Sequence, residues 1–166
     1  KLSVTHHSAT LAKEEIKDGP RIEVADSLQV SLGLGLMVME LAGIARDGGS
    51  LDDAMAFFDK EKAEFMSYCS VDTLVYLVKG GRASRLQGFF GSLLDIKPVL
   101  LVKDGEIHPV DRVRTRKRMV QRLADVARSH GKPRALGVLH SASPEEADVL
   151  AELCSPYFPR ENMIVS

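Results

Sequence analysis

The sequence has few of the residues that build disulfide, metal and cofactor sites. Among its 166 residues there are only two cysteines, Cys69 and Cys154. Two cysteines are too few for a disulfide framework, and this scarcity is typical of a reducing compartment, so a cytoplasmic location is expected. The five histidines form no HExxH motif and the cysteines form no CxxC motif, so the sequence predicts no metal site.

Long apolar runs and catalytic motifs are missing as well. The most apolar stretch, LGLGLMVMELAGIA, is broken by glycines and a glutamate. It is shorter than the roughly 18 residues of a membrane span, so no stable membrane insertion is expected. No GxSxG motif is present for a nucleophilic serine. Gly33 and Gly35 resemble the start of a dinucleotide loop, but Val38 stands where its third glycine is needed. The sequence therefore predicts neither an enzyme active site nor a cofactor.

Apolar periodicity and turn residues predict a mixed α/β fold. Residues 21–26 alternate like a strand, and residues 33–49 form an almost wholly apolar helix that should be deeply buried. The clearest feature is a β-hairpin over residues 97–114, with Asp104 and Gly105 as its two-residue turn. Further strands are expected at residues 68–72, 134–140 and 163–165, and further helices at residues 5–19, 50–65, 73–79, 83–95, 115–130 and 143–154. The predicted helix N-caps are Ser50, Asp72 and Thr115.

Positive charge is concentrated in one part of the chain. Residues 79–118 carry ten Lys or Arg against four Asp or Glu, whereas the whole chain has a net charge of −1. Arg116, Lys117 and Arg118 fall in the first turn of a predicted helix, where cations oppose the helix dipole. This placement favours contact with a phosphate, a carboxylate or an acidic partner surface; a solvated basic face is the alternative. The pI of about 6.6 makes nucleic acid a weaker candidate.

Apolar side chains are frequent on the helices that contain glycine. Such a surface can mould around an irregular apolar ligand, although core packing is the alternative. The residues concerned are Met37, Met39, Phe89, Phe90, Leu93 and Leu94.

Four motifs follow one another within residues 71–118, VDTLVYLVKGGRASRLQGFFGSLLDIKPVLLVKDGEIHPVDRVRTRKR. They are a helix that ends in KGGR, a GSLLDIKPVL segment, a DGEIHP hairpin and an RVRTRKR helix start. LSVTHHSATLA and VADSLQVSLGLGLMVMELA precede them, and ALGVLHSASPEEADVL follows. This combination resembles the DegV family of bacterial fatty-acid-binding proteins.

The resemblance implies a two-domain α/β protein. Residues 1–66 would be the C-terminal portion of a first, parallel-sheet domain. Residues 67–166 would be most of a second α/β domain that contains the β-hairpin, so we expect the chain to be an internal piece of a longer protein. The resemblance also implies that a long-chain fatty acid is buried in the interior and that its carboxyl group is presented to a separate fatty-acid kinase. The chain would then be a carrier and not an enzyme, with no cofactor and no nucleic acid partner.

Residues that match the family's pattern would form two groups. The expected lipid-binding residues are Ser3, Thr5, Gly33, Leu34 and Met37. The residues expected to face the partner or a phosphate are Arg82, Arg112 and Arg114. A phosphate-handling enzyme or kinase component that uses the basic face is the alternative function, and a regulator that contacts nucleic acid is a third.

Overall fold

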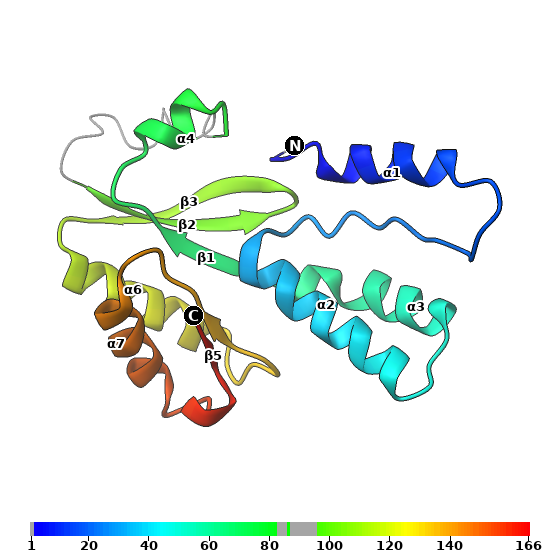
Figure 1. Cartoon of the computed structure of the whole chain (residues 1–166). Helices are drawn as coiled ribbons and strands as arrows, with labels where there is room; N and C mark the ends of the chain where they lie inside the picture. Colours follow the sequence, from blue (N-terminus) through cyan, green and yellow to red (C-terminus); the bar gives the residue numbers. More distant parts are fainter. Residues whose placement is uncertain (1, 83–85, 87–95) are drawn as a thin grey trace.

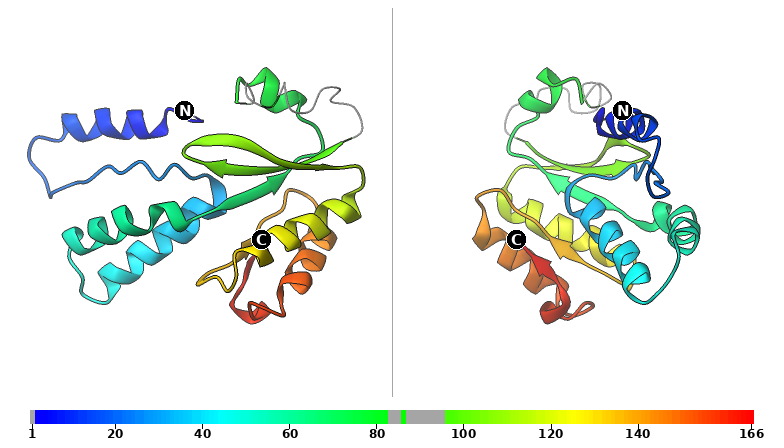
Figure 2. Two further views of the ribbon diagram at one scale, coloured as in Figure 1. Left: turned by 180° about the vertical axis from the view of Figure 1, so that it is seen from behind. Right: turned by 45° about the vertical axis from the view of Figure 1, so that its right-hand side comes forward.

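The computed structural model describes residues 2–82, 86 and 96–166. Its elements form two groups. Helices α1, α2 and α3 belong to residues 2–66, the first segment, and lie on one side of the molecule in Figure 1. The strands and helices α4, α6 and α7 belong to residues 67–166, the second segment, and lie on the other side (Figures 1 and 2). The predicted mixed α/β class is confirmed.

The first segment is helical in every regular element that the structure describes. Residues 16–30 form an extended link between α1 and α2 (Figure 1). The strand predicted at residues 21–26 is wrong, because none of the described strands pairs with this link. An alternating sequence becomes a strand only when a neighbouring strand takes up its N–H and C=O groups. The helices are α1 (Thr5–Glu15), α2 (Ser31–Arg46), α3 (Leu51–Glu61) and the short η1 (Lys62–Glu64).

Helix α2 is less buried than its sequence predicts. Among its residues only Gly33 and Met37 are buried, whereas Leu34, Val38 and Met39 are 40%, 53% and 59% exposed. The expectation of a deeply buried helix is therefore wrong. The helix packs along one stripe against α3 and β4, so half of its apolar residues face away from the described packing.

The second segment contains two small sheets and the helices that cover them. Its strands are β1 (Ser67–Ser70), β2 (Lys97–Lys103), β3 (Glu106–Val113), β4 (Gly137–Val138) and β5 (Ile164–Val165). Its helices are α4 (Val75–Lys79), α6 (Arg116–Ser129), α7 (Pro144–Cys154) and the short η2 (Arg160–Asn162). Of the helix predicted at residues 83–95, only Leu86 is described, and it is buried; the rest, with Phe89, Phe90, Leu93 and Leu94, lies outside the described residues.

The larger sheet is antiparallel with strand order β1-β2-β3, and the smaller one pairs β4 with β5 in parallel. The predicted hairpin is confirmed. Asp104 and Gly105 both have positive φ angles, 53° and 68°, which is the conformation of a type I′ turn. Helix α6 packs on one face of the larger sheet, and α4 lies on the opposite face (Figures 1 and 2).

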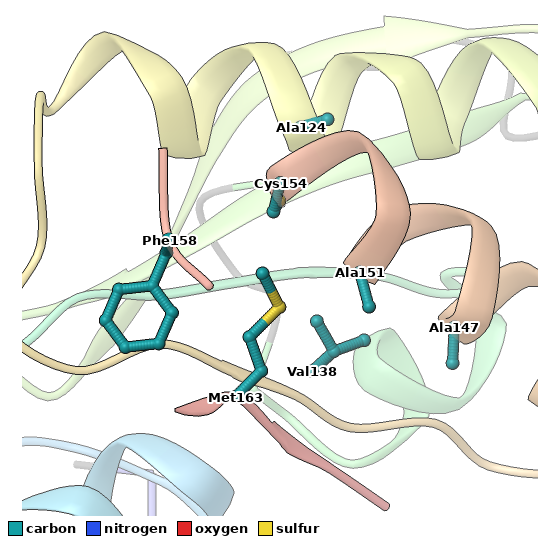
Figure 3. Packing of buried hydrophobic residues seen from close by; sticks show 7 residues of the cluster. All are labelled: Ala124, Val138, Ala147, Ala151, Cys154, Phe158 and Met163. Atoms are coloured by element: carbon teal, nitrogen blue, oxygen red, sulfur yellow. The ribbon is translucent and has the colours of Figure 1, made fainter. Parts of the chain in front are cut away.

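A second packing layer joins α6 and α7 to the small sheet. Figure 3 shows Ala151 and Ala147 of α7 beside Val138 of β4, with Phe158 and Met163 closing the cluster. Small alanine side chains on α6 and α7 let the two helices approach closely. This packing holds the start of α7 near the start of α6.

Two of the three predicted helix caps are confirmed. The Ser50 hydroxyl accepts the Asp53 N–H in a reciprocal capping box, and the Thr115 hydroxyl accepts the Arg118 N–H. The prediction for Asp72 is wrong, because the Val75 N–H is accepted by the Thr73 hydroxyl instead. The Asp72 carboxylate is engaged elsewhere, in the ion pairs described below.

Candidate functional site

Two clefts adjoin one another beside β1. The first, the α7 cleft, has a volume of about 480 Å³ and lies among β1, α6, β4 and α7. The second, the α2 cleft, has a volume of about 470 Å³ and lies between the start of α2, the end of α3 and the end of α6. They share four lining residues, so the two clefts are neighbours, and together they are called the channel below. The shared residues are Met66, Tyr68, Ala127 and Leu136.

The α7 cleft has apolar walls and a charged rim. Met119, Leu123 and Leu150 belong to its wall, whereas Asp72 and Arg116 belong to its rim. Volumes of this size are typical of small-molecule sites, which combine mostly apolar walls with a few placed polar groups.

Arg116 is the centre of the charged rim. Its Nη1 donates to both carboxylate oxygens of Asp72 at 3.0 and 3.1 Å. Its Nε and Nη2 donate to the two carboxylate oxygens of Glu146, and Nη2 also donates to the Ser143 hydroxyl at 3.0 Å. Lys97 Nζ adds a second cation 2.9 Å from Asp72 Oδ1. The anionic contact predicted for Arg116 is thus made within the chain.

These ion pairs lower the pKa of the Asp72 and Glu146 carboxyl groups. The Lys97 ammonium, followed by Arg116, lowers the pKa of Asp72. The hydrogen bonds from Arg116 lower the pKa of Glu146, and the same pair raises the pKa of Arg116. The cation at the start of α6 therefore has compensating carboxylates, one from the end of β1 and one from the first turn of α7.

Cys69, Cys154 and Ser70 also line the α7 cleft. Burial raises the pKa of the Cys69 and Cys154 thiols, so neither is a ready nucleophile. The Ser70 hydroxyl oxygen is buried and has no hydrogen-bond partner among the described residues. Within these residues, no group of three His, Cys, Asp or Glu side chains could hold a metal ion.

The α2 cleft brings residues of the two segments together. The Tyr68 hydroxyl lies 2.8 Å from His130 Nε2, and burial raises the pKa of Tyr68. Across the cleft, the Arg134 guanidinium lies 3.7 Å from Glu40, 3.8 Å from Glu61 and 5.3 Å from the centre of the Phe57 ring. These contacts connect the loop before β4 with α2 and α3.

One of the five expected lipid-binding residues lines a cleft. Gly33 belongs to the wall of the α2 cleft. Met37 is buried and Leu34 is exposed, and neither lines either cleft. Ser3 and Thr5 are exposed at the start of α1, with their hydroxyl oxygens 2.5 Å apart.

The three expected partner-facing arginines lie outside both clefts. Arg82 donates from Nε to the Leu2 carbonyl at 3.3 Å and from Nη1 to the Gly80 carbonyl at 2.6 Å. This places Arg82 beside the N-terminal residues that include Ser3. Arg112 and Arg114 are exposed at the end of β3 and in the link to α6.

Sequence reasoning missed the residues that the two clefts share. Met66, Tyr68, Ala127 and Leu136 come from three parts of the chain and form no motif. Only the packing of α6 between β1 and β4 brings them together, so no local signal could have identified them.

None of the helices described by the structure is both long and apolar enough to cross a bilayer.

Comparisons with known proteins agree over nearly the whole chain. The family profile described as "Uncharacterised protein, DegV family" matches residues 1–166. A DegV domain-containing protein of Streptomyces coelicolor is 37% identical over 153 residues, which cover 91% of this chain and 54% of that protein.

Two solved structures show the same arrangement of elements. A fatty-acid-binding DegV family protein from Thermus thermophilus is similar with a TM-score of 0.86 and 31% identity, over 99% of this chain and 60% of that one. A stearic-acid-binding protein from Eubacterium ventriosum has a TM-score of 0.82 and 26% identity, over 94% of this chain and 56% of that one. The chain thus spans little more than half the length of these relatives. The match over all 166 residues shows that this chain belongs to the DegV family.

Proposed function

We propose that this chain contributes to binding a long-chain fatty acid, and that the acyl chain lies along the channel formed by the α2 and α7 clefts. The observation that carries the proposal is the similarity, over 99% of the chain, to a DegV family protein described as binding fatty acid. Two neighbouring clefts with mostly apolar walls suit a linear apolar ligand. Burial of each methylene group contributes about 0.8 kcal/mol, so a long chain supplies most of the binding energy.

Native mass spectrometry with lipid extraction tests this proposal directly. The complete protein is purified from cells, and its mass is measured before and after denaturation. We expect an added mass equal to that of a long-chain fatty acid, lost on denaturation. Protein that remains without ligand after incubation with fatty acids would overturn the proposal.

We further propose that the exposed basic surface formed by Arg112, Arg114, Lys117 and Arg118 docks a separate fatty-acid kinase, to which the carboxyl group is presented. All four residues are exposed, and Lys117 and Arg118 stand in the first turn of α6. Arg116, in contrast, forms ion pairs with Asp72 and Glu146. Clustered exposed cations favour an acidic or phosphate-bearing partner and accelerate its association.

Charge reversal separates docking from lipid binding. In the double variant Arg112→Glu and Arg114→Glu, we expect retained fatty acid to be unchanged, because neither residue lines the channel. The rate of kinase-dependent acyl phosphate formation should fall by about tenfold or more, since like charges oppose docking. Arg46→Glu, at the end of α2, is the matched control and should change neither quantity. An unchanged phosphorylation rate in the double variant would rule out this docking surface.

A further inference from the structure

The first turn of α2 fits between β1 and β4 at two positions where an added Cβ atom would clash with a neighbouring side chain. A Cβ atom added at Gly33 would lie 2.1 Å from the Ser67 hydroxyl oxygen of β1. A Cβ atom added at Gly137 of β4 would lie 2.3 Å from Leu32 Cδ2 and 3.0 Å from Leu32 Cγ. Glycine allows such close approach because it has no side chain. The Ser67 side chain therefore occupies the space that Gly33 leaves open, and the Leu32 side chain occupies the space that Gly137 leaves open. These two spaces are called the glycine notches.

The notch at Gly33 is reinforced by hydrogen bonds. The Ser67 hydroxyl donates to Gln29 Oε1 at 2.9 Å, and Gln29 Nε2 donates to the Phe65 carbonyl at 2.6 Å. An alanine at position 33 would force the Ser67 hydroxyl to rotate away from Gln29, so this bond would be lost.

The chain has a strained backbone at the start of this turn and just before it. Leu28 and Ser31 have φ angles of 55° and 52°. This is the left-handed region, which residues other than glycine rarely adopt. Such conformations persist where surrounding contacts hold them. Here the Leu28 N–H is bonded to Asp26 Oδ1 at 3.1 Å, and Gln29 is fixed to the start of β1.

Both glycines also border the proposed ligand channel. Gly33 lines the α2 cleft and Gly137 lines the α7 cleft, so the two notches seat the same helical turn against the walls of both. A shift of this turn would move both walls together. The other two helical glycines of α2 lack this property. The nearest atom to an added Cβ is 3.7 Å away at Gly35 and 3.9 Å away at Gly43.

We propose that Gly33 and Gly137 are positioning residues that set how far apart the walls of the two clefts lie, and thereby how much of an acyl chain the clefts accommodate. The inference rests on the proposed fatty acid binding. It goes further because it assigns selectivity to the two glycine notches, together called the joint, which need not touch the ligand. Gly33 acts through Ser67, and Gly137 acts through Leu32.

The joint is tested first without ligand, from melting temperatures of the full chain. Gly33→Ala should lower the melting temperature in the unmodified chain. In a Ser67→Ala background the same change should lower the melting temperature less, because the 2.1 Å clash and the hydrogen bond are already gone and only the 2.9 Å approach to Gln29 Oε1 remains. Gly137→Ala should likewise cost less in a Leu32→Ala background. Gly43→Ala is the control and should not depend on either background. Equal effects of Gly33→Ala with and without Ser67 would overturn the joint.

The selectivity role is tested by the ratio of dissociation constants for lauric and stearic acid. We expect Gly33→Ala and Gly137→Ala to change this ratio by about tenfold, equivalent to about 1.4 kcal/mol. The ratio should return to within about twofold of its original value when Ser67→Ala is added to Gly33→Ala. Gly43→Ala should leave the ratio unchanged.

The outcomes separate the inference from the proposed function. A chain that shows the coupling in melting temperature but an unchanged ratio has a joint with a purely structural role, and the selectivity role is overturned. If the unmodified chain binds neither acid, the proposed function fails together with the selectivity role, while the melting temperatures still decide the joint.

Discussion

At the scale of single residues, Arg116 shows how an unfavourable position becomes a stable one. A cation in the first turn of α6 opposes the helix dipole, and from sequence this favoured contact with a phosphate, a carboxylate or an acidic partner surface. In the structure, Asp72 and Glu146 supply the anion. Asp72 follows β1 and Glu146 begins α7, so the pairing also ties three elements together. The interpretation of the basic stretch changes accordingly. Arg116 forms its ion pairs within the chain, whereas its neighbours Lys117 and Arg118 are not needed for those pairs.

Replacement of Arg116 should reduce the dependence of stability on acid pH. The pKa of Glu146 is lowered chiefly by Arg116, so the pair contributes stability above the unfolded pKa of Glu146 and loses it as pH falls through the folded pKa. Arg116→Met should therefore give a smaller fall in melting temperature than the unmodified chain as pH decreases below about 4. The exposed position keeps the effect small.

The control for this prediction is Arg46→Met, which removes another exposed arginine near a helix end. Its melting temperature should follow the same pH profile as the unmodified chain. If Arg116→Met and Arg46→Met give the same profile from pH 3 to pH 7, roughly the range in which carboxyl groups titrate, the ion pairs at the rim do not contribute as inferred.

At the scale of elements, the sequence predicts what is decided locally. The hairpin turn, the caps at Ser50 and Thr115, and the end of α4 at Gly80 and Gly81 all follow from a few neighbouring residues. The strand expected at residues 21–26 did not form, because a strand needs a neighbouring strand that is distant in the sequence. The same reason explains why the clefts could not be predicted, since their shared residues meet only after α6 has packed.

Gly105→Ala tests the hairpin turn. At a φ of 68°, an alanine costs about 1–2 kcal/mol of folding free energy, and its Cβ would also lie 3.2 Å from Leu28 Cδ2. Gly81 is the matched control, because its φ is 70° and no atom of the residues that the structure describes lies within 4 Å of an added Cβ. In urea unfolding, Gly105→Ala should therefore lower stability more than Gly81→Ala. The reverse order would show that Leu28 does not hold the turn as the geometry indicates.

At the scale of the whole molecule, specific contacts join the two segments. The Ser67 hydroxyl of β1 donates to Gln29, the two glycine notches seat α2, and Arg134 pairs with Glu40 and Glu61. The channel lies beside these same contacts. Whatever fills the channel therefore touches both segments, and its binding energy should stabilise them as a unit.

A bound fatty acid should consequently raise the melting temperature of the whole chain with little dependence on salt. At a free concentration of about 100 times the dissociation constant, a ligand adds about 2.7 kcal/mol to the stability of the state that binds it. Because burial of the acyl chain provides most of this energy, the stabilisation by stearic acid should be nearly equal at low and at high salt. Binding through several phosphate contacts would instead weaken steeply as salt increases. Thermal unfolding with and without stearic acid, at two salt concentrations, distinguishes the two modes. A gain that disappears at high salt would favour the phosphate-handling alternative, in which the exposed cations near α6 are the binding surface and the channel is not.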